Sequence, residues 1–109
     1  MRSWWEYDCL MPKLTITNHD AVRFGAILRR LRVTRGWTIV TAARRCDMNP
    51  NYLGALEKGG NMISVWTLLD VAEVYGVNAS DIVGEVEELR RAARKEHAAA
   101  VAANMPPIE

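Results

Sequence analysis

The stretch that most constrains the fold is residues 38–58, TIVTAARRCDMNPNYLGALEK, because it carries the start and end signals of two short helices. Thr38 is a residue type that caps a helix, where its hydroxyl accepts a hydrogen bond from a free backbone amide. Asp47 follows where the chain must turn, and aspartate tolerates a left-handed backbone better than most residues. Asn49 and Pro50 then predict a second helix, with asparagine as its cap and proline at its first position. Two short helices joined by a tight turn predict a helix-turn-helix unit.

The apolar positions of this stretch indicate which side of each helix faces the core. The inward positions predicted for the two helices are Ala42, Ala43, Cys46, Met48, Leu53 and Leu56. The outward positions predicted around the second helix are Asn49, Asn51, Gly54, Ala55 and Lys58. At an inward position a free thiol such as that of Cys46 behaves as a small hydrophobe.

Three further helices are predicted around this unit. The first covers residues 21–35, and its inward positions, spaced as on one helix face, are Phe24, Ile27, Leu28 and Leu31. The next begins after a cap at Ser64 and runs to about residue 75, with an inward stripe of Val65, Leu68, Leu69 and Ala72 and with Trp66 exposed. The last starts after Ser80 and continues through an alanine-rich segment, with an apolar stripe of Ile82, Val83, Val86, Leu89 and Ala93.

These helices predict an all-α fold, a compact five-helix bundle with a C-terminal helical extension. We expect residues 1–20 to form an N-terminal arm, residues 21–84 the helix-turn-helix domain, and residues 85–109 the extension and tail. The arm contains Trp4, Trp5 and Tyr7, which are too apolar for a disordered tail, so we expect it to fold back on the domain or to pack in a dimer. Met11 offers an alternative start of the chain.

Charge is distributed unevenly along the chain, although the net charge is only +1. Residues 21–58 carry eight arginines and lysines against two acidic residues, whereas residues 59–89 carry six acidic residues and no arginine or lysine. The basic half contains the helix-turn-helix unit, so it can neutralise DNA phosphates. The alternative is two solvated faces of opposite sign that attract each other or a second subunit.

Composition excludes several other classes of protein. No stretch approaches the ~18 apolar residues of a membrane span, and the first residues lack the apolar region of a signal peptide. A soluble cytoplasmic protein is therefore expected. Cys9, Cys46, His19 and His97 lack the spacing of a zinc site, so we expect no metal and no cofactor. Because no nucleophile with a base and no paired carboxylates lie on a recognisable frame, we expect no catalytic residues and no enzyme.

Three segments resemble the phage repressor and Cro-like (Xre-type) helix-turn-helix family, whose fold is lambda repressor-like. They are FGAILRRLRVTRGWT, the unit at residues 38–58, and the pattern Ser64, Val65, Thr67, Leu68, Leu69, Ala72, Gly76 and Val77. The resemblance covers about residues 24–83. It implies that the second helix of the unit lies in the major groove of double-stranded DNA. It also implies a structural ion pair between Arg32 and Glu57, and a homodimer formed through the last helix and its extension. The residues alone leave a second possibility, in which this long helix is solvated and packs on its own domain.

The resemblance places DNA-binding residues on the second helix of the unit and beside it. The residues predicted to bind DNA are Arg44, Arg45, Asn49, Asn51, Tyr52, Ala55 and Lys58, and Arg29 and Arg30 are further candidates for phosphate contacts. Two roles stay open. Asn49 either contacts a base or caps the helix, and Tyr52 either donates to a phosphate or packs against the first helix of the unit. Ile39 stands where the family often has a phosphate-binding glutamine.

The predicted function is therefore sequence-specific or shape-dependent DNA binding by a transcriptional regulator, a repressor in the manner of this family's phage and bacterial members. The alternative is an antitoxin or another interaction protein of the same fold. In that case Trp66 or the N-terminal aromatic residues would contact a protein partner.

Overall fold

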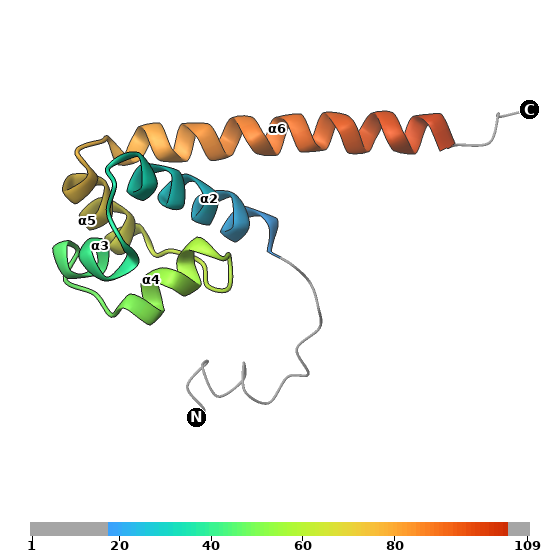
Figure 1. Ribbon diagram of the computed structural model, residues 1–109. Helices are drawn as coiled ribbons and strands as arrows, with labels where there is room; N and C mark the ends of the chain where they lie inside the picture. The colour runs from blue at the N-terminus through green and yellow to red at the C-terminus, as the bar shows by residue number, and fades with distance from the viewer. Residues whose placement is uncertain (1–17, 105–109) are drawn as a thin grey trace, which may run out of the picture.

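The computed structural model describes residues 18–104, which form five α-helices and contain no β-strand. In chain order they are α2 (His19–Thr34), α3 (Ile39–Arg45), α4 (Pro50–Glu57), α5 (Val65–Tyr75) and α6 (Ala79–Asn104). Figure 1 shows α2 through the middle of the bundle, with α6 along one side of it and α4 on the other. The all-α bundle predicted from the sequence is confirmed. The predictions for Trp4, Trp5, Tyr7 and Met11 lie outside the described residues.

Helices α2 and α5 start after residues whose side chains cap them. Asn18 Oδ1 accepts from the amides of Asp20 at 3.1 Å and Ala21 at 3.2 Å, so α2 begins two residues earlier than expected. Ser64 Oγ accepts from the amide of Thr67 at 3.1 Å and caps α5, as predicted. At the other end of α5, Gly76 adopts a left-handed φ of 71° and stops the helix.

The core lies between α2, α3, α4, α5 and the start of α6. Its buried side chains are Ala21, Phe24, Ile27, Leu28, Ala42, Ala43, Leu53, Leu56, Ile63, Leu68, Val71, Ala72, Tyr75, Ile82 and Val86. Cys46 and Met48 pack against this cluster from its edge and remain partly exposed. Burial raises the pKa of the Cys46 thiol, which therefore stays protonated near neutral pH.

The inward face predicted for α5 was partly wrong. Val65 and Leu69 are 70% and 50% exposed, whereas Val71 and Tyr75, which the sequence did not assign to the core, are buried. The physical reason is that α5 is apolar around most of its circumference, so two overlapping stripes fit the helical period. Tertiary packing selects the stripe at positions 68, 71, 72 and 75. Trp66 is exposed, as predicted.

Only the first half of α6 packs closely on the bundle. Ile82 and Val86 are buried, but Leu89, which we expected in the same stripe, is exposed at the edge of the contact with α2. The next residue, Arg90, still pairs with Asp20 on α2 at 3.5 Å, and the C-terminal part of the helix then extends past the bundle (Figure 1). α6 continues without a break through residues 84 and 85, where the sequence suggested a boundary between domain and extension. Within residues 18–104, no helix has the length and apolar character that crossing a membrane requires.

Candidate nucleic-acid interface

The turn between α3 and α4 is fixed by backbone hydrogen bonds at the end of α3. The amide of Asp47 donates to the carbonyl oxygen of Arg44 at 3.2 Å, and the amide of Met48 donates to that of Ala43 at 2.9 Å. At this turn Asp47 adopts a φ of 54°, the left-handed conformation that the sequence predicted. This is the pattern of a Schellman motif, which satisfies free carbonyls at a helix end and turns the chain sharply.

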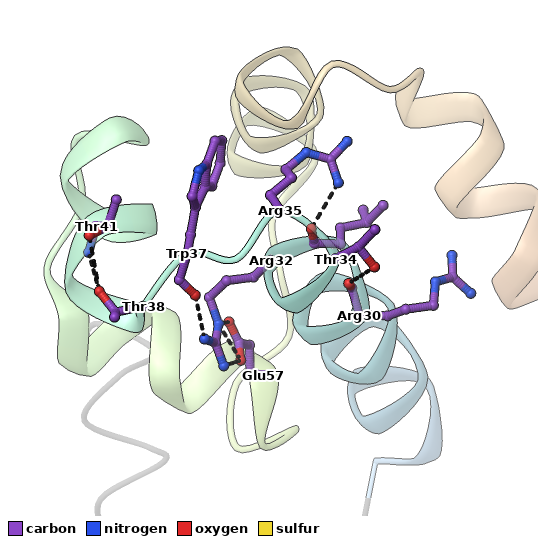
Figure 2. Close-up of polar contacts among 9 residues, drawn as sticks. Arg30, Arg32, Thr34, Arg35, Trp37, Thr38, Thr41 and Glu57 are labelled. Atoms are coloured by element: carbon purple, nitrogen blue, oxygen red, sulfur yellow. Dashed lines mark hydrogen bonds and ion pairs between the residues drawn. The ribbon is translucent and has the colours of Figure 1, made fainter.

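Both helices of the unit begin with the predicted side-chain cap. Thr38 Oγ1 accepts from the amide of Thr41 at 3.1 Å (Figure 2), and Asn49 Oδ1 accepts from the amide of Asn51 at 2.8 Å. Pro50 occupies the first position of α4, where its missing N–H leaves no hydrogen bond unmade. The capping role of Asn49 is therefore present in the structure, and its side-chain oxygen is already engaged.

α4 is held against α2 by a close approach of the two backbones at Gly25. A Cβ atom at this position would lie 2.3 Å from the carbonyl oxygen of Leu56 and 2.6 Å from that of Glu57. Glycine is therefore required for α2 to come this near to the end of α4. Leu53 and Leu56 are fully buried on the inward side of α4, so its opposite side must face solvent.

The Arg32–Glu57 ion pair implied by the family resemblance is present and joins α2 to α4. Arg32 Nε donates to Glu57 Oε2 at 2.9 Å and Arg32 Nη2 donates to Glu57 Oε1 at 3.0 Å, a two-pronged arrangement (Figure 2). Arg32 Nη1 also donates to the backbone carbonyl of Trp37 at 2.9 Å. The hydrogen bonds to Glu57 raise the pKa of Arg32 above its ordinary value, so the guanidinium keeps its charge. Arg32, which lies on α2, thus holds both the end of α4 and the segment before α3 against α2.

The outward side of α4 borders two shallow surface hollows that meet at Pro50. One is lined by Arg29, Arg32, Ile39, Pro50, Asn51, Gly54, Ala55, Glu57 and Lys58. The other is lined by Val40, Arg44, Asp47, Met48, Asn49 and Pro50. The predicted site residues Arg44, Asn49, Asn51, Ala55 and Lys58 therefore lie on one continuous surface, which we call the α4 surface. Gly54 lies within it, and a Cβ atom there would meet no heavy atom within 4 Å.

Some basic residues near the α4 surface form ion pairs within the protein, and others do not. Arg30 donates to Glu85 Oε1 at 2.8 Å and is thereby drawn toward α6, whereas its neighbour Arg29 lines the hollow beside Lys58. Within residues 18–104, Arg29, Arg44 and Lys58 take part in no ion pair. These three cations are therefore available to an anionic ligand. In the sequence, Arg29 differs from Arg30 because it lies three residues before Arg32. That spacing places Arg29 and Arg32 on the same side of α2, the side that meets α4.

Two predicted site residues, Arg45 and Tyr52, line neither hollow. The guanidinium of Arg45 lies 4.6 Å from the centre of the Trp37 ring, a cation–π arrangement that ties the end of α3 to the core edge. Tyr52 is exposed on α4. The side chain of Ile39 is aliphatic and packs against the core, so this side chain cannot donate a hydrogen bond to a phosphate.

A capped helix-turn-helix whose second helix is exposed between unpaired cations defines a class of nucleic-acid-binding protein. Residues 23–83 match a family model described as a helix-turn-helix domain. This match covers more than half of the chain, so the chain belongs to the helix-turn-helix family. The relatives and structural neighbours place it among members of the Xre type.

Known relatives are regulators. The chain is 34% identical over 56 residues to the HTH-type transcriptional regulator RamB of Mycobacterium tuberculosis. That match covers 51% of this chain but 12% of RamB, so the chain corresponds to a small part of that relative's length.

Solved structures of similar fold are also regulators or controllers. One structure of the clp gene regulator ClgR from Corynebacterium glutamicum superimposes with a TM-score of 0.63 at 27% identity, covering 81% of this chain and 96% of ClgR. The restriction-modification controller protein C.AhdI from Aeromonas hydrophila gives a TM-score of 0.57 at 28% identity, covering 59% of this chain and 97% of C.AhdI. These findings point to a DNA-binding regulatory family rather than to an enzyme family.

Proposed function

We propose that the protein is a transcriptional regulator that binds double-stranded DNA by placing α4 in the major groove. The observation that carries this proposal is the α4 surface, on which Asn51 lies between the unpaired cations Arg29, Lys58 and Arg44. In a helix-turn-helix the second helix reads base edges while the surrounding residues contact the sugar–phosphate backbone. The regulators RamB and ClgR, to which the chain is similar, support this assignment.

Few side chains on the α4 surface can read bases directly. Asn51 can form two hydrogen bonds with an adenine, and Ala55 can contact a thymine methyl group. Asn49 has its oxygen engaged in the cap, so only its amide group could donate to a base. Gly54 has no side chain to offer. We therefore infer that phosphate contacts and the shape of the DNA supply much of the affinity.

We propose further that the protein acts in the cytoplasm as a homodimer, because one module of this size reads only a few base pairs. Two copies related by a two-fold axis would bind half-sites about 34 Å apart. The part of α6 that extends past the bundle, with its exposed alanine-rich end, is the proposed dimer helix. Repression then follows if the bound dimer blocks a promoter. We assign the protein no catalytic activity.

The test begins with selection of bound sequences from random duplex DNA, followed by affinity measurements over a range of salt concentrations. Arg29, Arg44 and Lys58 give three candidate phosphate contacts per protomer and six per dimer. At about −0.9 per neutralised phosphate, the plot of log affinity against log salt should have a slope of about −5.

Single variants separate this interface from general basic character. Lys58→Gln and Arg44→Gln each remove two contacts from a dimer, so each should make the slope shallower by about 1.8. Arg30→Gln is the matched control, because Arg30 is exposed on α2 but pairs with Glu85 at 2.8 Å and is drawn away from the α4 surface. Absence of binding to every selected duplex at low salt, or equal slopes in all three variants, would contradict the proposal.

A further inference from the structure

The outer face of α5 carries apolar side chains that the α4 surface does not use. Val65, Trp66 and Leu69 are exposed on this helix, and Met62 is exposed in the segment that leads into it. Leu69 lies three positions after Trp66 and four after Val65, so on a helix it neighbours both. We call these four residues the α5 patch.

The α5 patch has no partner within residues 18–104. Trp66 is 79% exposed, and the buried face of α5 is the opposite one, through Leu68 and Val71. A large aromatic side chain grouped with aliphatic neighbours on a protein surface is typical of a contact site, since tryptophan contributes more than most residues when a partner covers it.

Acidic side chains flank the α5 patch on the same face of the helix. Asp70 lies four positions after Trp66, and Glu73 lies four after Leu69. Neither carboxylate forms an ion pair with any described residue, whereas Glu85 and Glu87 are paired with arginines. No arginine or lysine occurs in the surrounding segment, residues 59–89. The patch therefore combines apolar contact area with uncompensated negative charge.

We propose that the α5 patch docks a basic, apolar segment of another protein. Apolar side chains of that segment would cover Trp66 and Leu69, and its lysines or arginines would meet Asp70 and Glu73. DNA does not fit, because its phosphates would be repelled by these carboxylates. A second copy of this chain fits poorly, because a two-fold contact between α5 helices would bring the same carboxylates together from both sides. The inference goes beyond DNA binding and does not depend on it.

The test uses the full chain, labelled with ¹⁵N, and a synthetic amphipathic helical peptide of leucine and lysine. Titration should shift the amide signals of the α5 patch, and the dissociation constant should rise about tenfold in Trp66→Ser and in the double variant Asp70→Asn/Glu73→Gln. Val33→Ser is the matched control, since Val33 is an exposed aliphatic residue on α2, and it should leave the affinity unchanged. The same peptide with glutamate in place of lysine should bind at least about tenfold more weakly.

Several results would overturn the proposal. The first is that the lysine peptide does not bind at ~1 mM, a concentration that detects weak transient contacts. The second is that the glutamate peptide binds as tightly as the lysine peptide. The third is that Val33→Ser weakens peptide binding as much as Trp66→Ser does. Sedimentation showing that Trp66→Ser dissociates a dimer would assign the patch to a second copy instead. Nuclear Overhauser contacts between Trp66 and residues 1–17 would assign it to this chain's own first residues. A loss of DNA affinity in Trp66→Ser would assign it to the DNA interface. Because DNA binding is measured separately, its failure leaves the peptide result intact.

Discussion

Replacement of Glu57 by alanine should cost the fold about 3 kcal/mol in free energy of unfolding. The variant removes the carboxylate that accepts from Arg32 Nε and Nη2, and it leaves the guanidinium in a site where only 14% of the arginine side chain is exposed. Removing one partner of a buried ion pair lowers the free energy of unfolding by ~3–5 kcal/mol. We take the lower end because Arg32 keeps its bond to the carbonyl of Trp37 and some access to water.

The change should be large in a melting experiment. For a domain of this size, 1 kcal/mol corresponds to roughly 4–8 °C in Tm, so Glu57→Ala should melt about 12–24 °C lower than the parent protein by circular dichroism. Glu57→Gln keeps the size and one neutral acceptor, so it should lose less. Arg32→Met combined with Glu57→Leu removes both charges and should be more stable than Glu57→Ala, because no buried charge is left unpaired.

DNA affinity serves as the second measurement, taken at a temperature where both proteins remain folded. Since Glu57 is 5% exposed, its loss should change affinity far less than stability. The reasoning is refuted if Glu57→Ala melts within about 2 °C of the parent protein, which is below the shift expected from 1 kcal/mol. It is also refuted if the double variant is destabilised by the sum of the single variants Arg32→Met and Glu57→Leu, because the two side chains would then be energetically independent.

Three further predictions follow from other contacts. Arg29→Gln should weaken DNA binding and flatten its salt dependence, whereas the adjacent Arg30→Gln should change neither, as measured by anisotropy with a selected duplex. Tyr75 is 2% exposed, its hydroxyl has no hydrogen-bond partner, and burial raises its pKa to about 12. Since the unfolded chain loses this proton near pH 10, stability should fall by up to ~2 kcal/mol between pH 10 and pH 12. Tyr75→Phe should be as stable as the parent protein or more so at pH 7, and should lose part of this alkaline step in urea unfolding. Gly25→Ala should lower Tm by at least about 10 °C, because its Cβ would lie 2.3 Å from the carbonyl oxygen of Leu56. An unchanged Tm would show that α2 and α4 can separate there at little cost.

Local signals in the sequence were sufficient for the helix-turn-helix unit. Thr38, Asp47, Asn49 and Pro50 each act through backbone groups within a few residues, so their roles could be predicted without knowledge of the tertiary fold. The Arg32–Glu57 pair joins residues far apart in sequence, and the family resemblance rather than any local pattern indicated it.

The parts that local signals left open depend on how helices pack. α5 is apolar on two sides, and the sequence alone did not say whether Leu69 or Val71 faces the core. Arg29 and Arg30 are consecutive and chemically identical, and a carboxylate on α6, Glu85, decides which of them is free. Arg45 is also exposed and basic, but its position over Trp37 required the relative placement of α3 and the loop before it.

The open space at Gly54 bears on how such a protein could acquire a new target. Position 54 faces outward on α4, in the hollow that Arg32 and Glu57 also line, but a Cβ atom there would meet no heavy atom within 4 Å. A glutamine introduced there would project from the α4 surface without displacing a neighbour, and would relieve part of the ~1 kcal/mol helix penalty of glycine relative to alanine. Since glutamine can pair with adenine in the major groove, a single codon change could give this protein a preference it now lacks. The scaffold that supports the helix would remain as it is.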